Sequence, residues 1–266
     1  MIDLSKIDYS HLDRPEILMF LFHPRPEWGS SHDNGEDVDI MIPVEKDVVV
    51  GARFYPVNKK SPTILLFHGN GEIVADYQDI GLLYNQLGIN FFPVDYRGYG
   101  RSSGQPTVTA MMRDAHVIFD NVRSWLQERH FDGRFMVMGR SLGSASALEL
   151  ASHYEKDIHG LIIESGFAYI RPLMQLLGID MNALNICEDD GFRNFDKVKS
   201  YSGPVLIIHA ERDHLIPYSE GQALYDASQA RQKRILKIPK ANHNDIFSRG
   251  LEVYMDAVRD FVAKIA

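Results

Sequence analysis

Cysteine is nearly missing from this sequence, whose 266 residues include a single one, Cys187. One cysteine cannot form an internal disulfide, so other interactions must hold the fold, and the composition is typical of a reducing compartment. Cys187 could be a reactive thiol, but a small loop residue without a chemical role is the simpler interpretation.

An excess of basic residues is missing too. Lysine and arginine number 28 against 36 aspartates and glutamates, and the formal net charge is −8. Nucleic acids and anionic membranes attract clustered lysine and arginine. The charge balance therefore argues against either of them as a standing partner.

Long apolar runs and a secretory leader are also missing. Residues 17–22 form the most apolar run near the N-terminus, and six residues are far fewer than the ~20 that a membrane-spanning helix needs. The N-terminus has no basic segment followed by a small-residue cleavage site, so no signal peptide is expected. We therefore expect no stable membrane anchor and a cytoplasmic location.

What the sequence does have is an alternation of short apolar runs with amphipathic stretches. Apolar residues make up 45% of the chain, which is ample for a core. Runs typical of buried parallel strands occur at 63–67, 90–94, 135–138, 160–163, 205–209 and 235–239, preceded by two further strands at 36–43 and 48–55. Helices are expected at 13–22, 80–87, 108–129, 144–154 and 251–265. This order predicts an α/β fold, a mostly parallel central sheet flanked by helices.

One predicted strand leads into a motif. Gly139-Arg-Ser-Leu-Gly143 follows the run at 135–138 and precedes residues 144–150, which favour a helix. Strand, sharp turn and helix around G-x-S-x-G are typical of a nucleophile elbow, in which the backbone of Ser141 is strained. Glycine on each side avoids clashes between the strand and the helix. The motif alone is a weak signal, so its partners decide the interpretation.

Four landmarks follow one another in a recognisable order. They are His68-Gly-Asn-Gly-Glu72, the motif around Ser141, Asp213 after a strand, and His243 before the last helix. In these residues, and in Asp95-Tyr-Arg-Gly-Tyr-Gly100, the sequence resembles the α/β-hydrolase superfamily from about residue 38 to the C-terminus. Within it, the sequence is similar to small serine hydrolases of the monoacylglycerol lipase-like and Bem46-like acyl hydrolase type. The resemblance implies an α/β-hydrolase fold in a single domain, residues 1–266.

A long insertion between predicted strands, residues 164–203, lies where this fold carries its lid. Long insertions in compact α/β domains are usually functional, so we expect a small cap over the active site. The alternative is that its apolar residues, such as Leu173 and Leu177, only fill the core.

A serine hydroxyl needs a base to take its proton, and the base needs an acid to orient it. His243 lies in a polar loop between the last strand and the last helix, so it can reach Ser141. The resemblance assigns the acid to Asp213. Glu211 in the same loop and Glu164 after the preceding strand are rivals for that role.

Two backbone N–H groups are needed to bind the oxyanion of a tetrahedral intermediate. Leu142, the residue after the nucleophile, is expected to supply one. The resemblance implies Asn70 as the second donor, with Gly71 as the next choice. It also implies that His68 and Glu72 brace this loop and take no part in proton transfer.

Three other features of the sequence are candidates for binding roles. Arg140 could bind an anionic part of the substrate, but a structural ion pair beneath the elbow is the preferred interpretation. Histidine pairs such as His153 with His159, or His209 with His214, lack the spacing and the supporting ligands of metal sites, so no metal is predicted. The glycine-rich loops match no nucleotide-binding motif, so no cofactor is expected.

Together these features predict a cofactor-independent serine hydrolase. Its substrate would be a carboxylic ester or thioester with a small to medium acyl or aryl group, cleaved through an acyl-enzyme on Ser141. One alternative is a non-catalytic ligand-binding or scaffold member of the fold, against which the complete set of triad residues argues. The other is a peptidase, which would usually carry a larger cap.

Overall fold

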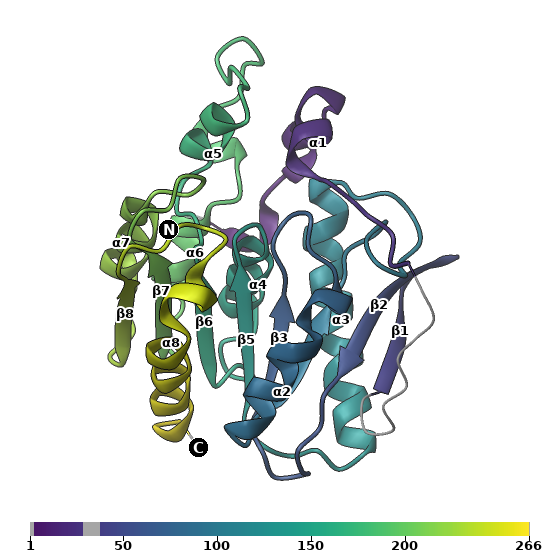
Figure 1. The fold of residues 1–266 in the computed structure, drawn as a ribbon. Helices are drawn as coiled ribbons and strands as arrows, with labels where there is room; N and C mark the ends of the chain where they lie inside the picture. The colour runs from purple at the N-terminus through teal and green to yellow at the C-terminus, as the bar shows by residue number, and fades with distance from the viewer. Residues whose placement is uncertain (1–2, 29–37, 266) are drawn as a thin grey trace.

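The computed structural model describes residues 3–28 and 38–265, and an eight-stranded sheet forms its centre (Figure 1). The strands are β1 (Val38–Glu45), β2 (Val48–Phe54), β3 (Thr63–Phe67), β4 (Asn90–Val94), β5 (Phe135–Arg140), β6 (Gly160–Glu164), β7 (Val205–Ala210) and β8 (Lys233–Ile238). Their order in the sheet is β1-β2-β4-β3-β5-β6-β7-β8. β1 pairs antiparallel with β2 and β2 with β4, whereas β3 to β8 run parallel.

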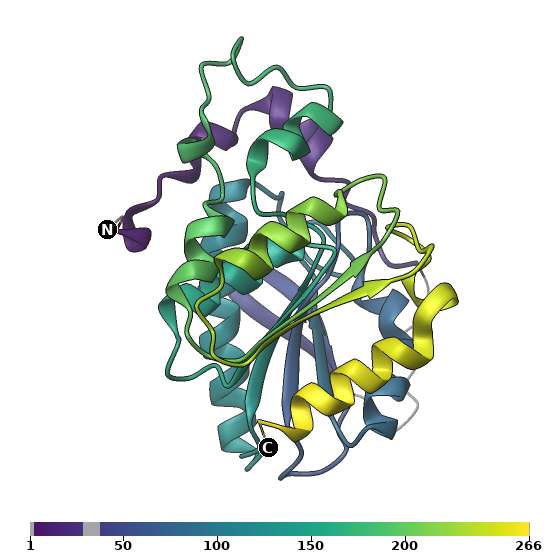
Figure 2. The same ribbon diagram turned by 90° about the vertical axis from the view of Figure 1, so that its left-hand side faces the viewer.

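Helices cover both faces of the sheet (Figure 2). They are α1 (Pro15–Leu21), α2 (Gln78–Gln86), α3 (Val108–Glu128), α4 (Gly143–His153), α5 (Ile170–Leu176), α6 (Asn194–Ser200), α7 (Tyr218–Ala227) and α8 (Ile246–Ala263). α2 and α8 pack on one face, and α3, α4, α6 and α7 pack on the other. This confirms the predicted α/β-hydrolase fold, a mostly parallel sheet flanked by helices.

The continuously apolar runs form the middle of the sheet. Every residue of β3, β4, β6 and β7 is buried, as expected for parallel strands covered by helices on both faces. The predicted strand at 36–43 is observed as β1, and residues 36 and 37 lie outside the described part of the chain.

Two boundaries near the C-terminus differ from the prediction. β8 begins at Lys233, two residues before the apolar run, because an edge strand can expose charged side chains to water. α8 begins at Ile246 and not at 251, and Gly250 has non-helical φ and ψ angles of −147° and 27° within it. The helical pattern expected from residue 251 is therefore the part of α8 that follows this kink.

Helices α6 and α7 were not predicted. The buried face of α7 consists of Glu220, Gly221, Leu224 and Ala227, so no apolar stripe marks it in the sequence. Glu220 is buried because its carboxylate accepts hydrogen bonds from the backbone N–H groups of Ala168 and Tyr169. A tertiary hydrogen bond thus replaces the apolar residue that periodicity would require.

The connection from β6 to β7 has two parts with different positions. α6 packs against α4 on a face of the sheet. α5 lies beyond the carboxyl ends of β5 and β6, next to α1 from the N-terminal segment (Figure 1). Two segments far apart in the sequence therefore lie over the same end of the sheet.

Candidate active site

The turn between β5 and α4 has the geometry of a nucleophile elbow. Ser141 has a φ of 51°, in the left-handed region that non-glycine residues rarely occupy. Its backbone N–H donates to the carbonyl oxygen of Glu164, 2.9 Å away. A Cβ on Gly139 would lie 2.3 Å from the oxygen of Gly143, and one on Gly143 would lie 2.1 Å from the oxygen of Phe67. Both positions therefore require glycine, as the sequence predicted.

Three loops bring Ser141, His243 and Asp213 together. The Nε2 atom of His243 lies 3.0 Å from Oγ of Ser141, and its Nδ1 atom lies 2.8 Å from Oδ2 of Asp213. The other oxygen of Asp213 accepts the N–H groups of Leu215 and Ile216 at 3.0 and 2.8 Å. This arrangement can pass a proton from the hydroxyl to the imidazole while the carboxylate holds the ring.

The surroundings of Asp213 favour its ionised form. Burial raises the pKa of this carboxyl, but the hydrogen bond and positive charge of His243 and the N–H of Ile216 outweigh burial, so the pKa lies below its usual value. A carboxylate that stays charged can stabilise an imidazolium next to it.

The two rival acids have other partners. Glu211 accepts a hydrogen bond from the backbone N–H of Lys240. Glu164 is buried, accepts the hydroxyl of Tyr254 at 2.6 Å and lies 3.1 Å from Nε of Arg140. Of the three acids considered from the sequence, Asp213 is the one hydrogen-bonded to the imidazole.

The loop after β3 is braced by the two residues expected to do so. His68 is fully buried, with Nε2 3.1 Å from the carboxylate of Asp95 and Nδ1 2.8 Å from the carbonyl oxygen of Gly69. Glu72 accepts the N–H of Gly69 at 2.8 Å. Neither side chain contacts the hydroxyl of Ser141, so both hold the backbone of the loop.

The two candidate oxyanion donors differ from Gly71 in their contacts. Within residues 3–28 and 38–265, the structure records no acceptor for the backbone N–H of Asn70 or of Leu142. The N–H of Gly71 is directed at the hydroxyl of Tyr99. The side-chain oxygen of Asn70 accepts the N–H of His23 and the Tyr99 hydroxyl at 2.9 and 2.6 Å. This geometry favours Asn70 over Gly71.

A cavity of about 440 Å³ opens beside Ser141. Its lining includes Phe20 and Leu21 of α1, Leu173 and Leu176 of α5, and Phe167, Leu215 and Ile216 from other loops. No role in the site was predicted for residues 13–22. The signal available in the sequence was the apolar run at 17–22, which is too short to span a membrane. In the structure Phe20 of this run is exposed, so the run does not only fill the core.

The chain is similar in sequence to a known family and to several known proteins. A family model described as Hydrolase_4, "Serine aminopeptidase, S33", matches residues 58–186. Human alpha/beta hydrolase domain-containing protein 17B is 31% identical over 76% of this chain and 66% of its own length. The chain belongs to the α/β-hydrolase superfamily.

Two other relatives and one solved structure extend the comparison. The lysophosphatidylserine lipase ABHD12 of Xenopus tropicalis is 33% identical over 76% of this chain and 57% of its own length. An uncharacterized membrane protein of Saccharomyces cerevisiae is 27% identical over 77% of this chain and 72% of its own length. The Pyrococcus furiosus esterase Pf2001 has the same fold, with a TM-score of 0.74 and 18% identity over 92% of this chain and 100% of that one. In the described residues of this α/β hydrolase, no helix combines the length and hydropathy needed to cross a bilayer.

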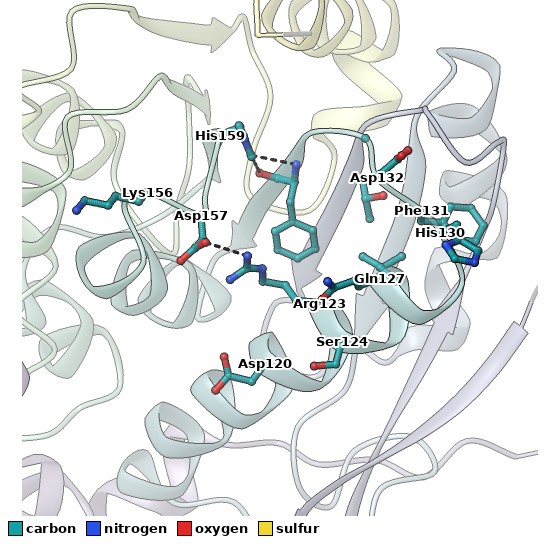
Figure 3. A pocket seen from close by; sticks show the side chains of 14 residues that line it. Asp120, Arg123, Ser124, Gln127, His130, Phe131, Asp132, Lys156, Asp157 and His159 are labelled. Carbon is teal, nitrogen blue, oxygen red and sulfur yellow. Dashed lines mark hydrogen bonds and ion pairs between the residues drawn. The ribbon is translucent and has the colours of Figure 1, made fainter.

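A larger cavity of this α/β hydrolase, about 700 Å³, lies at the opposite end of the sheet (Figure 3). It reaches Thr63 and Phe135, the first residues of β3 and β5, whereas Ser141 follows the last residue of β5. Its walls combine apolar side chains with charged ones, which include an ion pair of 2.8 Å between Arg123 and Asp157. Ligands of open α/β sheets bind at the carboxyl ends of the strands, so the smaller cavity is the candidate active site.

One cluster of possible metal ligands involves residues that the sequence did not pair. His116 of α3 and Glu149 and His153 of α4 offer ligand atoms within 4.8 Å of one another. The Glu149 carboxylate already lies 2.6 Å from Nζ of Lys197, and both ring nitrogens of His116 have partners, Glu149 and Tyr154. These contacts account for the cluster, because a bound cation would compete with the Lys197 ammonium for the same carboxylate.

Proposed function

We propose that this protein is a serine hydrolase that cleaves a carboxylic ester or thioester through an acyl-enzyme on Ser141. The observation that carries the proposal is the hydrogen-bonded series from Asp213 through His243 to Ser141 beside an apolar cavity. No cofactor enters the reaction as proposed.

In the first half of the reaction, Nε2 of His243 takes the proton of the Ser141 hydroxyl while Oγ attacks the carbonyl carbon of the substrate. The oxyanion that forms accepts the backbone N–H groups of Asn70 and Leu142, each worth about 10²- to 10³-fold in kcat. The imidazolium, stabilised by Asp213, then protonates the leaving alcohol or thiol, which departs and leaves the acyl group on Oγ.

In the second half, water replaces the leaving group. His243 takes a proton from the water, whose oxygen attacks the acyl carbon, and the second tetrahedral intermediate collapses to release the acid. The proton returns from the imidazolium to Oγ of Ser141, so the enzyme ends in its starting state.

The walls of the cavity support a small to medium acyl or aryl group as substrate. Apolar side chains of α1 and α5 face the space next to Ser141. The relative named a lysophosphatidylserine lipase and the esterase of the same fold agree with ester hydrolysis. As part of the proposal, residues 164–203 supply a small cap to a single domain of residues 1–266, and α5 is the part of the cap that borders the cavity.

The test is hydrolysis of p-nitrophenyl esters from acetate to palmitate by the wild-type protein and by Ser141→Ala. We expect a chain-length optimum in the wild type and a loss of about a thousandfold or more in kcat in the variant. A fluorophosphonate should label the wild type alone. Absence of both turnover and labelling in the wild type would refute the hydrolase and favour a non-catalytic ligand-binding or scaffold protein.

A second candidate is an aminopeptidase, because the matching family model is described by that activity. The same residues could attack an amide, since the steps above require only a carbonyl carbon and a leaving group that accepts a proton. Aminoacyl p-nitroanilides assayed beside the ester series distinguish the two: a kcat/KM higher on the anilides than on every ester would favour the peptidase.

We also propose a cytoplasmic location. The single cysteine and the acidic net charge support it, whereas the yeast relative is named a membrane protein. Fractionation of cells that produce the full chain tests this point, and recovery of the protein in the membrane pellet after a salt wash would refute it.

A further inference from the structure

Arg140, the residue immediately before Ser141, contacts the loop that carries Asn70 and the loop that carries His243. Its Nη1 atom lies 2.7 Å from Oε1 of Glu72, in the loop that carries Asn70. Its Nη2 atom donates to the backbone carbonyl oxygen of His243 at 3.0 Å. One guanidinium therefore joins the nucleophile turn, the oxyanion loop and the loop of the base.

The partners of Arg140 hold the backbone around the reacting groups. Glu72 accepts the N–H of Gly69 and the hydroxyl of Tyr77 on its second oxygen, at 2.8 and 2.6 Å. The hydrogen bond from Gly69 to Glu72 fixes the turn just before Asn70. Glu164 lies 3.1 Å from Nε of Arg140, and its own backbone oxygen accepts the N–H of Ser141.

The same contacts argue against Arg140 as a receptor for an anionic substrate. The guanidinium already faces two carboxylates and a carbonyl oxygen, and the side chain is only 12% exposed. Burial raises the pKa of Glu72, but the charge of Arg140 and the Tyr77 hydroxyl outweigh it, so the net shift is downward. Glu72 is therefore an anion that neutralises Arg140, so the guanidinium does not offer a free positive charge to the cavity.

We infer that Arg140 is a positioning residue that sets how Ser141, the imidazole of His243 and the N–H of Asn70 lie relative to one another. The inference rests on the proposed function, because it assigns a task in that reaction. Its physical basis is that a planar guanidinium offers several donors in a fixed arrangement, which a lysine ammonium does not. Holding the reacting groups in place lowers the barrier, and a displacement of about 1 Å can cost roughly 10²-fold in rate.

The experiment compares Arg140→Met and Arg140→Lys with the control Arg53→Met. Arg53 is also buried and paired with a carboxylate, Asp39, but it lies on β2, in the antiparallel part of the sheet. The rate constant is measured per active site, titrated by a fluorophosphonate, so that misfolded protein does not count. We expect kcat per site to fall about 10- to 100-fold in Arg140→Met, with KM changed less than about threefold. Arg140→Lys should lie between it and the wild type.

A merely structural role would give a different result. Arg140→Met would then lose stability as Arg53→Met does, while kcat per titrated site stayed within about twofold of the wild type; this outcome overturns the inference. If Arg140→Met does not fold, Arg140→Lys and Glu72→Gln provide the same comparison, because the first keeps the positive charge but not the planar set of donors, and the second removes the charge of one partner of the guanidinium.

A crystal structure of the Arg140 variant separates this inference from the proposed function. A separation between Nε2 of His243 and Oγ of Ser141 above about 3.5 Å supports the positioning role, even if the wild type hydrolyses none of the esters. An unchanged separation, and an unchanged position of the Asn70 N–H, contradict it. Failure of wild-type turnover and labelling refutes the hydrolase proposal alone.

Discussion

At the scale of single residues, the protonation state of Asp213 links the site to the stability of the fold. The pKa of its carboxyl is lower in the folded protein than its usual value: burial opposes this shift, but the hydrogen bond and charge of His243 outweigh it. The folded state therefore binds this proton more weakly than the unfolded state does. The carboxylate stabilises the fold above the unfolded pKa of about 3.9, and this stabilisation is lost as the pH falls through the folded pKa.

The first prediction concerns Asp213→Asn. The amide cannot ionise, so the variant should lose less stability than the wild type between about pH 5 and pH 2, as measured by urea unfolding at stepped pH. Its kcat should fall by roughly 10⁴-fold, because an amide favours the wrong tautomer of the imidazole. Asp226→Asn, at an exposed carboxylate, serves as the control. Equal acid sensitivity of Asp213→Asn and the wild type would contradict the prediction.

The second prediction compares two glycines. Gly143→Ala places a Cβ 2.1 Å from the backbone oxygen of Phe67, where neither strand nor helix can yield easily. Gly88→Ala meets no atom within 4 Å and is strained only by its φ of 76°. We expect the first change to cost about 3 kcal/mol or more and the second about 1–2 kcal/mol in the free energy of unfolding. Equal losses of the free energy of unfolding, measured with urea, would show that the closeness of the Phe67 oxygen is not the reason for glycine at position 143.

At the scale of elements, α1 joins the N-terminal segment to the site. Phe20 and Leu21 line the cavity, and the N–H of His23 donates to the side chain of Asn70 in the oxyanion loop. Leu173 and Leu176 of α5, from the β6–β7 connection, line the same cavity. Two short helices outside the sheet therefore form part of the wall of the candidate site.

The third prediction follows from this placement of α1. Phe20→Ala removes an apolar wall, so kcat/KM should fall for long-chain esters by about fourfold for each methylene that loses its contact, at ~0.8 kcal/mol per methylene. Activity on the acetate ester should stay within about twofold. Met19→Ala is the matched control, because Met19 is on the same helix, is 65% exposed and does not line the cavity. An equal loss of kcat/KM in Phe20→Ala and Met19→Ala would show that the side chain of Phe20 does not bind the acyl chain.

The elements themselves were predictable to different degrees. Fully buried parallel strands leave an unbroken apolar run, so β3 to β7 could be located from the sequence. α7 could not, because its buried face includes Glu220, whose partners lie more than fifty residues away in the chain. The start of α8 was misplaced because Gly250 interrupts its helical pattern.

At the scale of the whole molecule, one buried cluster ties distant parts of the chain together. Nζ of Lys197, on α6, lies 2.6 Å from the carboxylate of Glu149 on α4 and 2.9 Å from the hydroxyl of Tyr9. Tyr9 in turn donates to Glu149 at 2.7 Å. Burial lowers the pKa of Lys197, and the charge of Glu149 opposes that shift. The cluster fixes the N-terminal segment and the β6–β7 connection to helix α4.

The fourth prediction tests this cluster. Lys197→Met leaves the buried carboxylate of Glu149 without its ammonium, so the free energy of unfolding should fall by about 3–5 kcal/mol. Lys199→Met, at an exposed lysine of the same helix, should change it by less than about 0.5 kcal/mol. The double variant Lys197→Met with Glu149→Gln should recover part of the loss. Urea unfolding measures all three, and a loss below about 1 kcal/mol in Lys197→Met would show that the pair contributes little.

The sequence by itself determined the fold class, the order of the strands along the chain and the residues proposed for the triad. It could do so because these depend on local patterns: an apolar run between helices, glycines around a strained serine, and acid and base in the loops that follow given strands. Asp213 could be favoured over its rivals from the resemblance, but not from spacing.

Only the tertiary structure decided which groups meet across those loops. It showed that His243 is hydrogen-bonded to Asp213, whereas Glu164 contacts Tyr254 and Arg140. It also brought α1 to the cavity and joined Lys197 to Glu149. These contacts depend on side-chain directions and on distances between segments far apart in the chain, and neither quantity is contained in a local pattern of residue types.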